Sequence, residues 1–241
     1  MTTPEPLLLL FDIDGTVMQG ASEAHATALV QALANVHGVN VAAIRLKGSA
    51  AGRTDGEIAR LYLLEAGVSA RRIDERAAAV QDECCRLYAA ICPPDLTAMV
   101  VPGMPELLAS LHAQPALKLS LVTGNFEGVA RRKLKAGGIG HWFAPGQGAF
   151  GSDAEDRAML PPIARRRAGA AAGWSVSWPR ERTVVIGDTP RDIACARADG
   201  LRCVAVTTGP HRREELLGAD ALAESAEQLA LVIAGLSAAG D

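Results

Sequence analysis

Two aspartates directly follow a short apolar run near the start of the chain. Asp12 and Asp14 come after Leu7–Phe11 and are followed by Gly15 and Thr16. A continuous apolar run of this length is typical of a strand buried on both faces of a parallel sheet, and α/β sheets bind ligands at the carboxyl ends of such strands. Paired carboxylates there suit nucleophilic attack, proton transfer and cation binding. The alternative is a turn in which the carboxylates cap backbone groups and Gly15 takes a positive φ.

A second acidic pair follows another apolar run. Residues 183–186 are predicted to form a buried strand, and Asp188 and Asp192 come after it, one helical turn apart. If this strand is parallel to the first, the two pairs meet at one edge of the sheet, where α/β sheets bind their ligands. The alternative for Asp192 is a first-turn helix acid that is stabilised by the helix dipole.

A third strand, predicted at 117–122, ends in Thr123, Gly124 and Asn125. A hydroxyl and neighbouring backbone N–H groups at that position can donate to the oxygens of a bound anion. From residue 98 onward, strands alternate with helices, which predicts a parallel sheet with helices on both faces. The helices in this part are predicted near 107–111, 126–136, 155–172, from 190 and from 225, with a fourth strand at 202–207.

The segment between the first two predicted strands contains no strand pattern. Apolar spacing predicts helices at 22–37, 58–66 and 69–91, with Thr54 or Asp55 as the cap of the second. Residues 18–97 are therefore predicted to be a helical unit inserted into a core formed by 1–17 and 98–241.

Composition excludes several classes of protein. The chain has 241 residues, 49% of them hydrophobic and 21% charged, with a net charge of −3, so no basic field invites nucleic acid or anionic lipid. The run Arg165 to Arg167 is predicted to be a solvated helix face. The start lacks a basic segment and its apolar run is too short for a membrane span, which predicts a cytoplasmic protein. The five cysteines are predicted to be free thiols, and the scattered histidines show no metal-ligand spacing.

Together these motifs resemble those of the haloacid dehalogenase-like hydrolases. The matching elements are Asp12-x-Asp14-x-Thr16, the strand-ending Thr123 and Gly187-Asp188-x-x-x-Asp192, which occur in the family's order over essentially the whole chain. The resemblance is to the phosphoglycolate phosphatase-like branch. It implies a Rossmann-like doubly wound parallel sheet under a small α-helical cap inserted after the first strand.

The resemblance also implies roles for the site residues. Asp12 would be the nucleophile, forming an aspartyl-phosphate, and Asp14 the acid and base. Thr123 would donate to the transferring oxygens. The implied cofactor is Mg²⁺, held by Asp12, Asp188 and the carbonyl of Asp14, with Asp192 orienting the metal's ligands. The predicted substrate-binding residues are Thr16, Gly124, Asn125 and Arg53.

The chain departs from the family where many relatives carry a lysine. None of Lys47, Lys118, Lys133 and Lys135 stands near a helix start between the second and third motifs. Arg157 does, and its guanidinium is predicted to bridge Asp12 and the phosphate. The alternative is a surface arginine that is paired with Glu155 or Asp156.

The expected substrate is a small phosphorylated metabolite, with phosphoglycolate the first candidate, because Arg53 in a polar turn could bind an anionic leaving group. Alternatives within the family are a sugar-phosphate mutase, for which His25 lacks the usual context, and a phosphonate hydrolase using Lys47. A haloacid hydrolase would lack the second acid, Asp14. A non-enzymatic phosphate-binding regulatory module is the alternative of another class. The chain is expected to be a monomer or homodimer.

Overall fold

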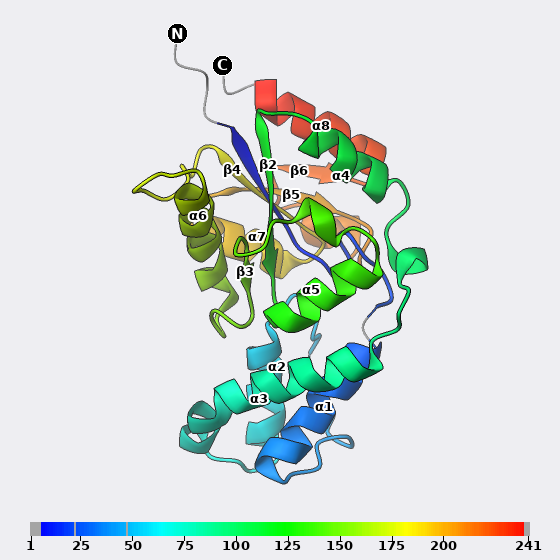
Figure 1. Ribbon diagram of the computed structural model, residues 1–241, viewed down its shortest axis with the longest axis vertical. Coiled ribbons are helices and arrows are strands. Elements are labelled where there is room, and N and C mark those ends of the chain that lie inside the picture. Colours follow the sequence, from blue (N-terminus) through cyan, green and yellow to red (C-terminus); the bar gives the residue numbers. More distant parts are fainter. Residues whose placement is uncertain (1–5, 22, 47, 239–241) are drawn as a thin grey trace.

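The computed structural model describes residues 6–21, 23–46 and 48–238 of the chain (Figure 1). The predicted helix start at Ser22, Lys47 and the segment 1–5 lie outside these residues. Six strands form one sheet in the order β3-β2-β1-β4-β5-β6, and every neighbouring pair is parallel. The strands are β1 (Leu7–Phe11), β2 (Leu117–Thr123), β3 (Ala149–Phe150), β4 (Thr183–Gly187), β5 (Arg202–Val206) and β6 (Ala221–Ala223).

The central position of β1 follows from its composition. All five of its side chains are buried, as expected for a strand with neighbours on both sides and helices on both faces. Phe11 pairs with Leu121 of β2 and with Ile186 of β4. The three strands therefore end at the same level, and the residues that follow them are brought to one edge.

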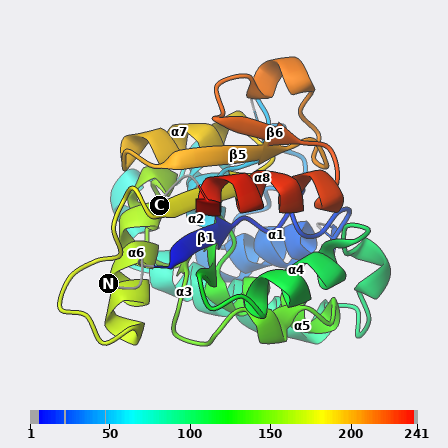
Figure 2. The same ribbon diagram turned by 90° about the horizontal axis from the view of Figure 1, so that it is seen from above.

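Two apolar layers hold helices against the sheet. On one face, alternate residues of β1 such as Leu9 pack with α4 (Met104–His112), α5 (Glu127–Ala136) and α8 (Ala226–Ala238). On the other face, Leu8 and Leu10 pack with α6 (Leu160–Ala171) and α7 (Pro190–Ala198). Figure 2 shows β1 in the interior of the molecule, surrounded by helices and neighbouring strands. The predicted Rossmann-like doubly wound fold is confirmed.

The first three helices after β1 form the lower part of the molecule in Figure 1: α1 (Glu23–His37), α2 (Asp55–Glu65) and α3 (Ala70–Ile91). They share an apolar cluster of their own, which also contains Phe126 and Val129 at the start of α5. Thr54 is the N-cap of α2, as predicted, and its hydroxyl accepts a hydrogen bond from the Glu57 N–H. We call α1–α3 and the turns between them the helical insertion.

Some predicted elements differ from the structure. β3 and β6 were not predicted, because two or three residues are too few to show a hydrophobic period. The helix predicted at 155–172 begins only at Leu160 and is preceded by a 3-10 turn, Arg157–Met159, capped by Asp156. Other 3-10 turns occur at Thr97–Met99, Gly140–Trp142 and Arg213–Leu216.

The prediction of a solvated arginine face on α6 is wrong for one residue of the run. Arg165 is buried and forms an ion pair with Asp199 at 2.7 Å, because this position of α6 faces α7. Arg167 pairs with Asp153 at 2.6 Å, and Arg166 is exposed. The cysteines are free, as predicted. Among the described residues, no helix is long and apolar enough to cross a membrane.

Truncating Leu9 should test the central role of β1. Leu9 is fully buried between Leu119 and Val184, so Leu9→Ala should lower the free energy of unfolding by about 2–5 kcal/mol. Urea unfolding measures this change. The control is Leu231→Ala on α8, where the side chain is 74% exposed and the cost should stay within about 0.5 kcal/mol. Equal effects of the two substitutions would contradict the packing described here.

Candidate active site

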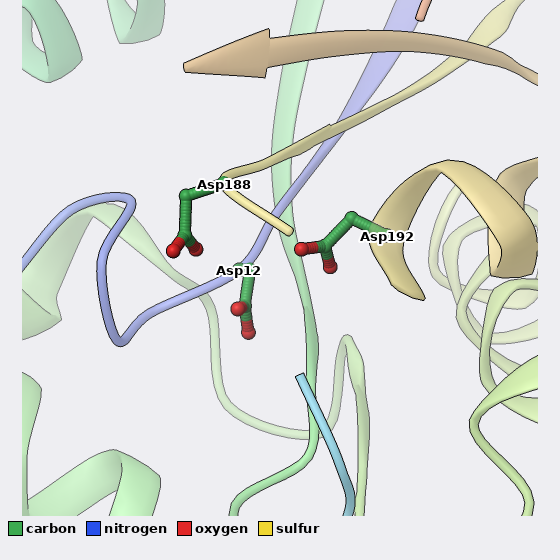
Figure 3. A group of neighbouring side chains, drawn as sticks. All are labelled: Asp12, Asp188 and Asp192. Carbon is green, nitrogen blue, oxygen red and sulfur yellow. The ribbon is translucent and has the colours of Figure 1, made fainter. Parts of the chain in front are cut away.

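Three carboxylates converge at the carboxyl ends of β1 and β4 (Figure 3). Asp12, Asp188 and Asp192 each offer an oxygen, these oxygens lie within 4.8 Å of one another, and all three residues are buried. Asp12 directly follows β1, Asp188 directly follows β4, and Asp192 lies in the first turn of α7. The parallel register of β1 and β4 therefore brings Asp12 close to two acids that lie 176 and 180 residues later in the sequence.

Burial makes two of these carboxylates, Asp12 and Asp188, hard to ionise. Loss of water raises the pKa of Asp12 to about 6, an effect that Arg157 opposes and Asp192 reinforces. Burial and the charges of Asp12 and Asp192 raise the pKa of Asp188 to about 8. A cation bound among them would favour the ionised forms.

Asp188, directly after β4, and Asp192, in α7, differ in their hydrogen bonds. The backbone N–H and hydroxyl of Thr189 donate to Asp192 Oδ2 at 2.9 and 2.7 Å, closing a capping box at the start of α7. Asp188 Oδ1 accepts a hydrogen bond from Thr16 at 3.0 Å, but its Oδ2 is buried without any hydrogen-bond partner. A Cβ atom at Gly15 or Gly209 would overlap this carboxylate, so both neighbours must be glycine-sized. The free oxygen of Asp188 is therefore an open acceptor.

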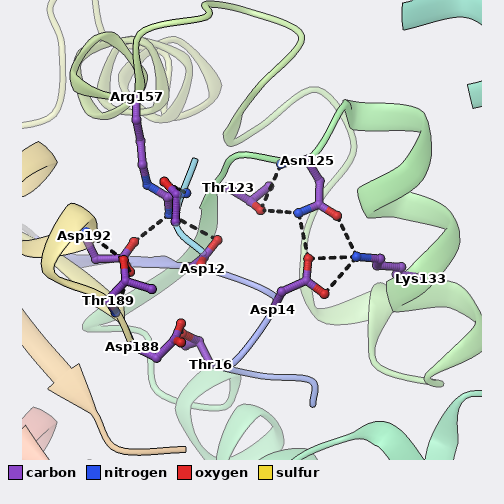
Figure 4. Close-up of polar contacts among 11 residues, drawn as sticks. Asp12, Asp14, Thr16, Thr123, Asn125, Lys133, Arg157, Asp188, Thr189 and Asp192 are labelled. Carbon is purple, nitrogen blue, oxygen red and sulfur yellow. Dashed lines mark hydrogen bonds and ion pairs between the residues drawn. The ribbon is translucent and has the colours of Figure 1, made fainter. Parts of the chain in front are cut away.

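Arg157 lies beside these acids and is buried (Figure 4). Its Nη2 lies 2.5 Å from Asp192 Oδ1 and 3.2 Å from Asp12 Oδ1, while Nη1 donates to the carbonyl of Gly52 at 3.1 Å. The structure thus excludes the alternative of a surface arginine paired with Glu155 or Asp156. Its predicted role in catalysis stays a prediction.

Asp14 belongs to a second polar group, which Figure 4 shows to the other side of Asp12. Lys133 Nζ donates to both carboxylate oxygens of Asp14, at 2.8 and 2.7 Å, and to Asn125 Oδ1 at 2.9 Å. Asn125 Nδ2 donates to Asp14 Oδ2 at 2.8 Å and to Thr123 Oγ1 at 3.1 Å. Although burial acts to raise the pKa of Asp14, the charge of Lys133 and the hydrogen bonds from Lys133 and Asn125 hold it below its usual value.

The sequence analysis gave Lys133 no role because it does not stand near a helix start, but the structure places it in contact with Asp14. Its side chain is fully buried. The signal was present in α5, where Val129, Ala130 and Leu134 form the buried face and Lys133 occupies the same face. A lysine in the apolar stripe of a helix is almost never buried without a partner.

His25 is the second residue that the sequence analysis undervalued. It was expected to be an ordinary helix residue, but it is buried, with Nε2 3.0 Å from Asp55 Oδ2 and Nδ1 3.2 Å from Lys133 Nζ. Because an ammonium group only donates, Nδ1 accepts and Nε2 carries the proton toward Asp55. Asp55 Oδ2 also accepts from the Phe126 N–H at 2.7 Å. This chain of contacts links the helical insertion to the sheet.

A cavity of about 610 Å³ lies between the sheet edge and the helical insertion. Its core side includes Asp12, Asp14, Asp188 and Arg157. Of the predicted substrate-binding residues, Gly124, Asn125 and Arg53 line it, whereas Thr16 is fully buried and contacts Asp188. Arg53 pairs with Glu57 of its own helix start and donates to the carbonyl of Ser49 at 3.1 Å.

Glycine at position 124 permits a close approach of the insertion to the core. A Cβ atom there would overlap the carbonyl of Arg53, and the Asp55 N–H donates to the Gly124 carbonyl at 2.8 Å. The turn around Arg53 therefore lies directly against the end of β2.

Comparison with known proteins identifies the family. The family model described as haloacid dehalogenase-like hydrolase matches residues 9–197, and a second, described as HAD-hydrolase-like, matches residues 160–238. The chain belongs to the haloacid dehalogenase-like hydrolases. The enzyme class and the family resemblance predicted from the sequence are thereby confirmed.

Individual relatives are distant. The chain is 27% identical to a phosphoglycolate phosphatase of Synechococcus elongatus over 88% of each chain. It is 28% identical to a phosphoglycolate phosphatase of Rhodospirillum rubrum over 90% of this chain and 86% of the relative. A predicted phosphatase from Clostridium acetobutylicum has the same fold, with a TM-score of 0.65 at 18% identity over 96% of this chain and 99% of the other.

The crowded carboxylates should make the metal-free hydrolase less stable as the pH rises. The folded-state pKa values of Asp12 and Asp188, about 6 and about 8, exceed the ordinary value of 3.8, so the folded protein holds more protons than the unfolded chain between these values. The free energy of unfolding should then fall between pH 5 and pH 8.5, because unfolding releases protons. Urea unfolding in the presence of EDTA measures this change.

The same urea unfolding measured with Mg²⁺ instead of EDTA provides the comparison. An ion bound to the ionised carboxylates should stabilise the folded protein more at pH 8.5 than at pH 5. Asp188→Asn should flatten the pH dependence in EDTA. A pH dependence that is the same in EDTA for the parent and for this variant would mean that the acids do not repel one another as described.

Proposed function

We propose that this protein is a Mg²⁺-dependent phosphomonoester hydrolase that acts through an aspartyl-phosphate on Asp12. The observation that carries the proposal is the buried cluster of Asp12, Asp188 and Asp192 at one end of a cavity, with Arg157 beside it. The family supports hydrolysis, and the names of the two curated relatives support a phosphate ester as substrate.

The residues present fit a magnesium ion. Mg²⁺ prefers carboxylate and carbonyl oxygens, and Asp188 Oδ2 is a buried acceptor without a partner. Asp12, Asp188 and the carbonyl of Asp14 would hold the ion. Asp192, whose oxygens already have partners in Thr189 and Arg157, would orient it indirectly. The ion would neutralise the charge on the phosphate and the nucleophile, which otherwise repel each other.

Asp12 would attack phosphorus, and the bond from phosphorus to the ester oxygen would break. Arg157 would donate to the transferring oxygens from one side, and Thr123 with the N–H groups near Gly124 from another. Water would then attack the aspartyl-phosphate at phosphorus, releasing inorganic phosphate and restoring Asp12.

Asp14 would serve both steps as the proton carrier. Its contact with Lys133 favours the ionised carboxylate, which suits the base that activates water. A phosphate dianion arriving beside Asp14 acts in the opposite direction, since a like charge raises the pKa of a carboxyl group. Asp14 could then protonate the leaving alcohol. Lys133 would be the positioning residue that fixes where this carboxylate lies.

We also propose that residues 18–97 are a cap over a core formed by 1–17 and 98–241, in a cytoplasmic monomer or homodimer. The chain leaves and re-enters the core at adjacent points, because Met18 and Val100 form an antiparallel bridge. The Gln19 N–H donates to the Met99 carbonyl at 2.7 Å. Two adjacent connections between the core and the cap would act as a hinge.

Phosphoglycolate is the substrate that the relatives' names suggest, and it is the reference compound for any assay. Its carboxylate would need a cation on the cap side of the cavity, and Arg53 remains the predicted contact. Because Arg53 is paired with Glu57, we propose the wider class of small phosphomonoesters.

Removing the nucleophile should abolish turnover. Asp12→Asn should lower kcat at least about a hundredfold, since loss of a nucleophile costs several powers of ten, while the fold persists. Steady-state phosphate release with p-nitrophenyl phosphate and Mg²⁺ measures this loss. Asp82→Asn, on an exposed position of α3, is the control and should match the parent. Activity of Asp12→Asn within tenfold of the parent would contradict the covalent mechanism.

Removing Lys133 should affect poor leaving groups most. If Lys133 places Asp14, then Lys133→Met should lower kcat/KM for ethyl phosphate at least about tenfold more than for p-nitrophenyl phosphate, whose leaving group needs no proton. Lys133→Gln keeps a donor and should recover part of the difference.

Lys135→Met is the matched control, because Lys135 lies on the same helix and is exposed. A purely structural lysine would slow both esters alike. Equal losses in Lys133→Met would therefore argue against its action through Asp14.

A further inference from the structure

We propose that the cap selects phosphomonoesters with an apolar leaving group larger than two carbons, in preference to those that carry a second anion. This inference rests on the proposed function, since it concerns the part of the substrate that leaves the phosphate. It is carried by the contrast between the two ends of the same cavity.

The cap side of the cavity is mainly apolar. Residues of two helices supply this wall, Ala26, Leu29 and Val30 from α1, and Ile58 and Tyr62 from α2. The charged core side is well suited to a phosphate and a metal ion. A leaving group attached to that phosphate would extend away from the acids and toward the aliphatic side chains.

The cations on the cap side, and most of its other polar groups, already have partners within the protein. Arg53 is paired with Glu57, and His25 lies between Asp55 and Lys133. Gln19 donates to the carbonyl of Thr208. A carboxylate placed here would lose water without gaining a free cation among the described lining residues, and Asp55 is close by. The charge of the wall therefore opposes an anionic leaving group.

The hydroxyl of Tyr62 is an exception among the polar groups of the wall, since no hydrogen bond is found for it among the described residues. It can bind one hydroxyl or carbonyl on an otherwise apolar substrate.

The size of the cavity also favours a leaving group larger than two carbons. Its volume of about 610 Å³ lies within the range of pockets that enclose ligands much larger than a two-carbon ester. Each further methylene buried against the wall should raise kcat/KM about fourfold. The increase should continue until the chain fills the apolar part.

The experiment measures kcat/KM with Mg²⁺ for a series of n-alkyl phosphates from ethyl to octyl, together with phosphoglycolate and p-nitrophenyl phosphate. We expect kcat/KM to rise at least about fiftyfold from ethyl to hexyl phosphate, given about fourfold for each of the added methylenes. Phosphoglycolate should be hydrolysed at least about tenfold less efficiently than butyl phosphate.

A variant in the wall separates chemistry from selection. Ala26→Arg adds a cation at an exposed position on the rim of the cavity, where core packing is not disturbed. It should reduce the chain-length dependence and raise kcat/KM for phosphoglycolate relative to butyl phosphate at least about fivefold. Thr27→Arg adds the same charge one residue away on α1, outside the cavity lining, and should leave the preference unchanged.

The outcomes distinguish the inference from the function on which it rests. A flat response to chain length in an active enzyme, or a preference for phosphoglycolate, would overturn the apolar assignment and leave the phosphatase intact. An equal response of the two arginine variants would overturn it as well. Absence of turnover with every ester, p-nitrophenyl phosphate included, would refute both.

Discussion

The close approach of buried carboxylates at the end of β1 and β4 is the constraint on which the rest of the site depends. Parallel strands in register deliver Asp12 and Asp188 to the same point, and the first turn of α7 adds Asp192. Mutual repulsion and loss of water both oppose this arrangement. Arg157 offsets part of the cost, and the unpartnered oxygen of Asp188 is the acceptor that the proposed Mg²⁺ would use.

A second cation, Lys133, gives the other acid a separate environment. Helix α5 packs on two sides. Phe126, just before the helix, and Val129 belong to the apolar cluster of the helical insertion, whereas Leu134 packs against the sheet. Lys133 lies between them and contacts Asp14. The two aspartates of the first motif thus face opposite electrostatic conditions, with the pKa of Asp12 raised and that of Asp14 lowered. Such a separation is what distinct roles as nucleophile and proton carrier require.

The two ends of the cavity also differ in chemical character. Its core end is built from charged groups that the sheet topology fixes, and its cap end from aliphatic side chains on two helices. Under the proposed function, the phosphate would bind at the charged core end and the leaving group at the aliphatic end, so different parts of the chain would recognise the two halves of the substrate.

The sequence by itself determined the sheet, its helices and the acids at its edge, because apolar runs ending in Asp12, Thr123 and Asp188 are local patterns that the parallel topology merely assembles. It did not reveal β3 or β6, which are too short to have a period. The position of Arg157 beside Asp12 was predicted, but only the tertiary structure decided that Lys133 meets Asp14 and that His25 meets Asp55. Each pair is distant in the sequence, and its contact depends on how α5 packs near the end of β1 and how α1 packs beside α2. Spacing along a chain encodes strands and turns, whereas a contact between two packed helices has no local signature.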